Sequence, residues 1–141
     1  MGKKSAKIEP LIGHLRGRDL DARYLGYFEC FNRGLFYEAH DVLEDLWLEE
    51  RKGPDGPFYK GLIQLAGAFV HLQKGRLRPA AALFDLARAN LEGYPTLHHQ
   101  LMRDTVLGEI NFWRQLLAAG GFERNPLTEH RAPQLAWLER G

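Results

Sequence analysis

The hydrophobic residues of this chain recur at helical rather than strand spacing. From Leu20 to Phe31 the apolar positions fall three or four residues apart, and no segment of strand length alternates apolar and polar residues cleanly. Glycine and proline residues separate the apolar segments and supply start and stop signals for helices. The pattern predicts five main helices and a short terminal one, at about 19–33, 36–52, 58–74, 79–93, 96–119 and 133–139.

An internal repeat indicates how these helices pair. The hexapeptide from Gly34 to Ala39 is echoed by the one from Gly75 to Ala80, and each lies at a turn between two predicted helices. A glycine turn followed by an alanine resembles the helical hairpins of tetratricopeptide-type proteins. We therefore predict an all-α fold, a compact bundle of two stacked helical hairpins whose open side is covered by C-terminal helices.

The chain is expected to divide into three segments. Residues 1–18 form a flexible or partly helical N-terminal segment, residues 19–119 the helical domain, and residues 120–141 an extension that packs on the body. We expect Trp113 and Trp137 to anchor the C-terminal helices on the body. His98 and His99 are adjacent on the fifth predicted helix, so they are expected to point about 100° apart into solvent.

On a helical wheel of the second predicted helix, two polar residues lie apart from the other charged ones. The solvent face carries the carboxylates of Glu38, Asp41, Asp45 and Glu49. His40 and Glu44, one helical turn apart, lie off this face. They fall between Trp47 and Leu48, inside an arc of apolar side chains. A buried imidazole or carboxylate is costly unless its hydrogen bonds are satisfied, so the pair predicts polar partners on a neighbouring helix.

The third predicted helix is apolar around most of its circumference, with one narrow polar stripe. The stripe comprises Lys60, Gln64 and His71. Gly67 beside it leaves room for close helix packing or for a ligand. The economical arrangement is that the stripe faces His40 and Glu44, with Trp47 as the wall of the resulting pocket. Lys60 could then bind an anionic ligand there.

The segment from His40 to Trp47, HDVLEDLW, has the HxxxExxW signature of the small helical proteins called domain of unknown function 309. The similarity begins in FNRGLFYEAH, extends through FYKGLIQLA and continues to Leu91. The resemblance implies an all-α fold in a soluble prokaryotic protein. By this resemblance, the site residues are His40, Glu44 and Trp47, with Gln64 and His71 as further members. The resemblance implies no activity because none is assigned to the family.

Three interpretations of this constellation remain open. The polar residues form a buried network that fixes how two helices pack. Alternatively, His40 and Glu44 act in catalysis, as an acid–base pair or, together with His71, as ligands of a divalent metal that activates water for hydrolysis. In the third interpretation the chain is a helical module that binds a peptide or protein in a groove lined by aromatic residues near the turns, namely Phe36, Tyr37, Phe58 and Tyr59.

Composition narrows the choice of partner and compartment. The 141 residues fit one domain, and 19 basic against 18 acidic residues give a net charge of +1, which argues against a nucleic-acid binder. The single cysteine, Cys30, allows neither an intramolecular disulfide nor a multi-cysteine zinc site, and we expect it to be a buried thiol. No secretory signal or membrane-spanning stretch is evident, so we expect a cytoplasmic protein without membrane contact. A homo-oligomer remains open.

Overall fold

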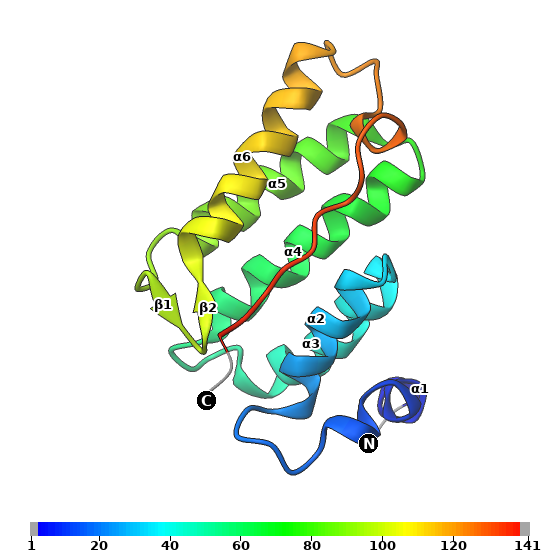
Figure 1. The fold of residues 1–141 in the computed structure, drawn as a ribbon. Coiled ribbons are helices and arrows are strands. Elements are labelled where there is room, and N and C mark those ends of the chain that lie inside the picture. The colour runs from blue at the N-terminus through cyan, green and yellow to red at the C-terminus, as the bar shows by residue number, and fades with distance from the viewer. Residues whose placement is uncertain (1–2, 139–141) are drawn as a thin grey trace.

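The structure, a computed structural model, describes residues 3–138 as six α-helices, two short 3-10 helices and one minimal β-hairpin (Figure 1). The helices are α1 (Lys3–Ile12), α2 (Ala22–Asn32), α3 (Phe36–Glu50), α4 (Gly56–Gln73), α5 (Leu77–Leu91) and α6 (Arg103–Ala119). The 3-10 helices are Gly13–Leu15 and Pro126–Thr128, and the strands are β1 (Leu97–His98) and β2 (Leu101–Met102). The prediction of an all-α bundle is confirmed.

The two turns of the sequence repeat have the same geometry. Gly34 follows α2 with φ 78°, and Gly75 follows α4 with φ 71°. After α2, Gly34 N donates to Phe31 O at 2.9 Å and Leu35 N donates to Cys30 O at 2.9 Å. The residues after α4 repeat this pair of bonds, which defines the Schellman motif. The sequence echo therefore reflects two helix ends that require a left-handed residue, and glycine takes that conformation without steric penalty.

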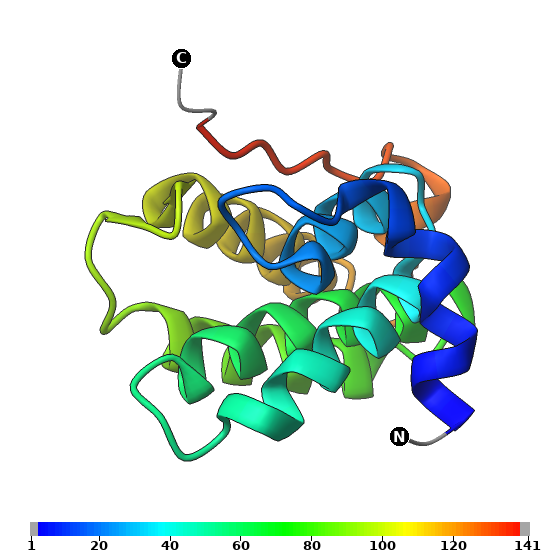
Figure 2. The ribbon, with the colours of Figure 1, turned by 90° about the horizontal axis from the view of Figure 1, so that it is seen from below.

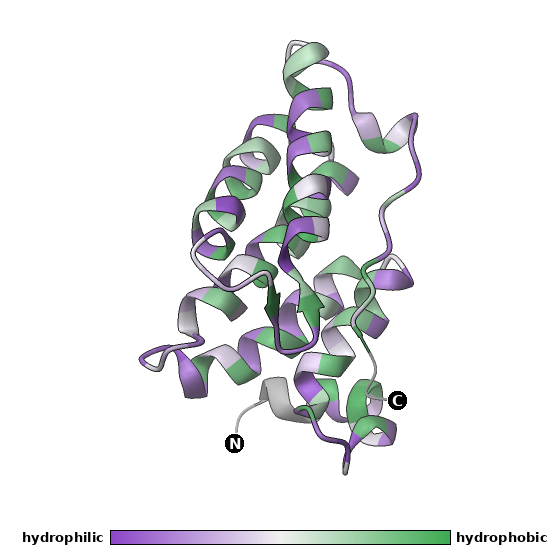
Figure 3. Cartoon of the chain, turned by 60° about the vertical axis from the view of Figure 1, so that its left-hand side comes forward, coloured by the Kyte–Doolittle hydropathy of each residue, from purple (hydrophilic) through white to green (hydrophobic). Residues whose placement is uncertain are grey.

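The core lies where the α2–α3 hairpin meets α4, α5 and α6. The Phe69 ring is the centre of an aromatic cluster: it stacks on Phe36 at 5.0 Å between centroids and meets Trp113 at 5.1 Å. Trp113 is buried, as expected of an anchor of the C-terminal helix, and so is Cys30. Figure 3 shows the alternation of hydrophilic and hydrophobic residues around each helix that permits this packing.

Two secondary-structure predictions near the C-terminus are wrong. The fifth helix does not begin near residue 96 but at Arg103, and the residues before it form the β1–β2 hairpin. The segment from Pro133 is extended rather than helical, and the last predicted residue, Glu139, lies outside the described residues. This segment runs between α2 and α6 across one face of the bundle (Figures 1 and 2).

Local contacts explain why the C-terminal segment stays extended. The Asn32 side chain accepts a hydrogen bond from Leu135 N at 2.6 Å and donates one to Leu135 O at 2.7 Å. Trp137 pairs with Leu101 as a β-bridge and packs on Phe28 with 5.5 Å between ring centroids. So short a helix is marginal by itself, and these contacts stabilise the extended form.

None of the helices among residues 3–138 is long and apolar enough to cross a membrane.

Candidate functional sites

A pocket of about 260 Å³ opens between α3, α4 and α5 at the place where the sequence predicts a polar site. Its lining residues are His40, Lys60, Ile63, Gln64, Gly67, Val70, His71 and Leu83. Four of the predicted residues, from two helices, thus meet in one hollow. The other four lining residues are Gly67 and the apolar residues Ile63, Val70 and Leu83, so the pocket has a polar and an apolar side.

His71 has an unsatisfied ring nitrogen in this pocket. Its Nδ1 is buried and has no hydrogen-bond partner in the structure. Burial, and then the positive charges of Arg76 and Lys74, lower the pKa of His71 below its ordinary value. The ring is therefore held neutral. Because buried polar atoms are nearly always hydrogen-bonded, this nitrogen is an unmet hydrogen-bonding group of a residue that lines the pocket.

His40 and Glu44 lie at the edge of this pocket rather than deep inside the protein. Their side chains are 31% and 26% exposed, and His40 Nε2 lies 3.6 Å from Glu44 Oε2. The other ring nitrogen of His40 is 3.3 Å from a carboxylate oxygen of Asp41. Glu44 is not among the lining residues, but its carboxylate contacts the imidazole of His40, which is.

The remaining predicted members have other partners than those expected. Gln64 Oε1 accepts a hydrogen bond at 2.7 Å from Asn90 Nδ2 on α5. Trp47 does not line the pocket. Its ring lies 4.3 Å from the Lys60 ammonium in a cation–π contact. Lys60 itself is a lining residue of the pocket.

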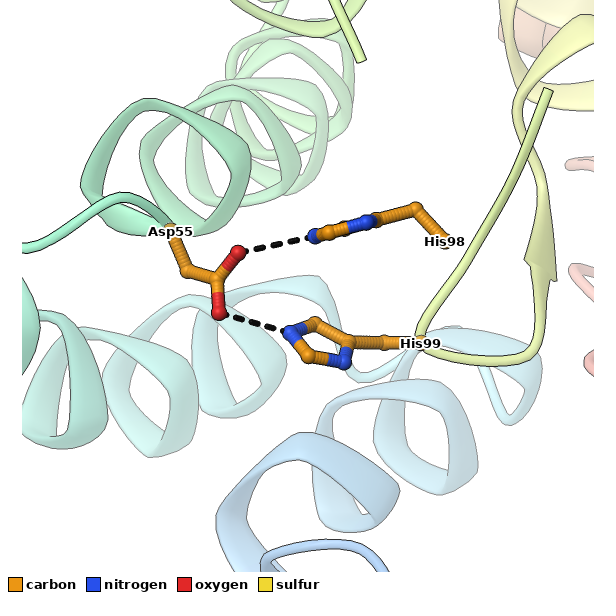
Figure 4. A group of neighbouring side chains, drawn as sticks. All are labelled: Asp55, His98 and His99. Carbon is orange, nitrogen blue, oxygen red and sulfur yellow. Dashed lines mark hydrogen bonds and ion pairs between the residues drawn. The ribbon is translucent and has the colours of Figure 1, made fainter. Parts of the chain in front are cut away.

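A second cluster joins Asp55, His98 and His99, and sequence analysis did not predict it (Figure 4). Asp55 precedes α4, and its two carboxylate oxygens contact His98 Nε2 at 2.8 Å and His99 Nε2 at 2.7 Å. The expectation that the two histidines lie exposed on a helix is wrong, because they belong to the β-hairpin and are half-buried. The adjacent histidines and the acidic residue within the Gly-Pro-Asp-Gly-Pro loop were the available signals, but neither indicates the other.

The charge state of this cluster follows from its contacts. Burial opposes ionisation of Asp55, but the hydrogen bonds from His99 and His98 outweigh it and hold the pKa of the carboxyl group below its ordinary value. Burial, together with the nearby Asp55 charge, raises the pKa of Tyr59 to about 12. Asp55 is therefore a carboxylate, and Tyr59 a neutral phenol, at neutral pH.

Only one of these two clusters has the ligand geometry of a metal site. Asp55, His98 and His99 each offer a ligand atom, and these atoms lie within 4.8 Å of one another. Among the described residues no other group of three histidine, cysteine or acidic side chains meets this condition. The set expected from sequence, His40, Glu44 and His71, is thus not drawn together in this way.

Residues 24–83 match the model of a family described as Domain of unknown function (DUF309). We refer to residues 24–83 as the DUF309 segment. The resemblance inferred from the HxxxExxW signature is confirmed, and all residues that line the inter-helix pocket fall within the DUF309 segment. His98 and His99 lie beyond it. No curated protein and no solved structure matches the chain.

Proposed function

We propose that the DUF309 segment binds a small monocarboxylic acid in the pocket between α3, α4 and α5. The unpaired Nδ1 of His71 is the observation that carries the proposal. It supplies a hydrogen-bonding group, while the Lys60 ammonium at the same pocket supplies a positive charge. Either group can donate a hydrogen bond to a carboxylate, and the two lie eleven residues apart on α4, about 16 Å along the helix axis.

The composition of the lining favours a carboxylate over a phosphate. Lys60 is the only lysine or arginine among the lining residues, so a single negative charge is matched and a phosphate dianion is not. Ile63, Val70 and Leu83 form an apolar wall that suits a short alkyl chain. The volume of about 260 Å³ admits a small metabolite rather than a peptide.

Acid–base chemistry on the bound ligand is a second candidate function, which the His40–Glu44 contact supports. A carboxylate 3.6 Å from Nε2 can orient the imidazole for proton transfer. The peptide-groove alternative has less support, because Phe36, Phe58 and Tyr59 are buried in the core and only Tyr37 of the four aromatic residues is exposed.

The test is a calorimetric titration with butyrate, and with inorganic phosphate as the competing chemistry. We expect saturable binding of one butyrate per chain, with weaker or no binding of phosphate. Nuclear magnetic resonance of the histidine rings should place the change at His71. Absence of saturable butyrate binding at millimolar concentrations, or binding that leaves the His71 ring unperturbed, would contradict the proposal.

A matched pair of glycine variants locates the binding. A Cβ at Gly67 would lie 3.1 Å from the Leu83 side chain at the pocket, whereas a Cβ at Gly108 in α6 meets nothing within 4 Å. Gly67→Leu should therefore fill the pocket and abolish butyrate binding, and Gly108→Leu should leave it intact. Equal binding by both variants would place the ligand elsewhere.

A further inference from the structure

His99 of the second cluster and Gln100 after it have a backbone conformation that residues other than glycine rarely adopt. β1 and β2 pair in the register Leu97 with Met102 and His98 with Leu101, so His99 and Gln100 alone form the turn. Their φ values are 47° and 63°. Two-residue turns with both φ angles positive favour asparagine and glycine. A histidine and a glutamine there store conformational strain, which persists only where the surrounding structure holds it.

Several contacts hold the turn against this strain. Tyr24 donates its hydroxyl hydrogen to His99 O at 2.9 Å, and Leu138 N donates to Gln100 O at 2.6 Å. Arg103 donates to Tyr94 O at 2.6 Å and so fixes the segment that leads into β1. The result is that two adjacent imidazoles, with ring centroids only 4.3 Å apart, both point their Nε2 atoms at one carboxylate.

The opposite side of the cluster is aromatic. Phe58 meets the His98 ring at 4.7 Å, and Tyr59 lies parallel to the His99 ring at 6.2 Å. These rings restrict the rotation of both imidazoles. The three side chains still keep between 23% and 33% of their surface exposed, so an ion and its water ligands can enter.

We propose that Asp55, His98 and His99 bind a divalent transition-metal ion, with Zn²⁺ as the best match. Imidazole nitrogen and carboxylate oxygen are the ligands that Zn²⁺ accepts in open sites, where three protein ligands leave a position for water or substrate. All three ligand atoms lie within 4.8 Å of one another, so small side-chain shifts bring them around one ion. Coordination through Nε2 requires each neutral imidazole to carry its ring proton on Nδ1, so the proton that faces Asp55 moves to the other nitrogen of the same ring.

Another imidazole–carboxylate contact in the same chain provides a reference. His14 Nε2 hydrogen-bonds both oxygens of Glu29, at 2.8 and 2.9 Å, but with one imidazole instead of two. Such a pair has two ligand groups and an ordinary surface role. The third ligand group therefore separates the proposed metal site from a simple ion pair, and His14 serves as its matched control.

The experiment uses the full chain purified without a polyhistidine tag, stripped with chelator and titrated with ZnCl₂. We expect one Zn²⁺ per chain and a melting temperature that rises with Zn²⁺ concentration. Asp55→Asn, His98→Gln and His99→Gln should each weaken binding by about 100-fold or more, since loss of groups outside the ligand set already costs about 10- to 100-fold. His14→Gln should change neither stoichiometry nor affinity.

Three results would overturn the proposal. The first is the absence of stoichiometric Zn²⁺ binding at concentrations of roughly 100 µM. The second is wild-type Zn²⁺ affinity in His98→Gln. The third is a loss of Zn²⁺ affinity in His14→Gln equal to that in the ligand variants. Circular dichroism checks that each variant folds. If the Asp55 variant does not fold, the wild-type histidine ring resonances decide the question, because Zn²⁺ must shift those of His98 and His99 together. A negative result for Zn²⁺ would leave the prediction of butyrate binding at the inter-helix pocket unchanged, so each proposal is tested independently of the other.

Discussion

The two polar sites of this protein differ in how completely the chain satisfies its own groups. At Asp55 both carboxylate oxygens have an imidazole partner, and the cluster is a preformed set of ligands around one negative charge. In the inter-helix pocket, His71 retains an unpaired nitrogen, and Lys60 and an apolar wall line the same pocket. A carboxylate with two imidazoles suits a cation, whereas a pocket with an ammonium and an unpaired imidazole suits an anion.

The backbone shows a parallel contrast. Where the helices of the DUF309 segment turn, the left-handed residues are Gly34 and Gly75. Where β1 turns into β2, they are His99 and Gln100. At the first pair, glycine allows the helices to end in a left-handed residue without strain. The second shows strain retained at the residue whose side chain reaches Asp55, as is common at functional sites.

The largest expected effect concerns Lys60. Lys60→Met keeps the aliphatic stem but removes the charge, so butyrate should bind about 10- to 100-fold more weakly, from the loss of a charge-assisted hydrogen bond of about 1.5–3 kcal/mol. Lys52→Met removes the same charge from an exposed lysine outside the pocket. Calorimetry on both variants checks the prediction. If the two lose affinity equally, only long-range charge matters and the pocket has no specific role.

The next largest effect concerns the turns at Gly34 and at Gln100. Substitutions there should change the free energy of unfolding by about 1 kcal/mol, with opposite signs. Gly34→Ala should destabilise the protein by about 1 kcal/mol, because alanine is strained at φ 78°. Gln100→Gly should stabilise it by a similar amount, because glycine relieves the strain at φ 63° and leaves both imidazoles in place. Urea unfolding measures both changes. Loss of stability in Gln100→Gly would mean that the hairpin is not strained.

The same contrast explains how far the sequence predicts this molecule. Helices α2 to α5 follow from apolar periodicity and from the glycine stops, and the motifs around His40 indicated the DUF309 family whose model matches residues 24–83. The hairpin was missed because Leu97 and Leu101, four residues apart, match helical spacing as well. Only the contacts with Asp55, in a distant loop, and with the C-terminal segment favour the hairpin over a helix.

Within the site, residue type and helix face were predictable, but the identity of each partner was not. The wheel correctly indicates that His40 and His71 belong to the same region between the helices. It does not reveal that Gln64 turns to Asn90 on α5, because that choice depends on the position of a third helix. Long-range contacts of this kind, including those of Asp55, arise from tertiary packing and leave no periodic signal.

A smaller effect should appear in the pH dependence of stability. Because the pKa of His71 is lower in the folded protein than its ordinary 6.5, the unfolded chain takes up a proton between these two values that the folded chain does not. Stability should therefore fall as the pH drops through 6.5 toward the folded pKa. His71→Gln removes this component, while His14→Gln serves as the exposed control. Urea unfolding at pH 7.5 and 5.5 gives the slopes, and an unchanged slope in His71→Gln would refute the burial argument.

The smallest expected effect is the energetic coupling between the two sites. Asp55 and His71 lie at opposite ends of α4, sixteen residues apart, which corresponds to about 24 Å along the helix axis. They also share no lining residue. A double-mutant cycle on unfolding free energy with His71→Gln and His98→Gln should thus be additive within about 0.5 kcal/mol. Butyrate should likewise leave Zn²⁺ affinity unchanged. A coupling above this limit would mean that α4 transmits ligand binding from one site to the other, and the two regions would then have to be treated as a single functional unit.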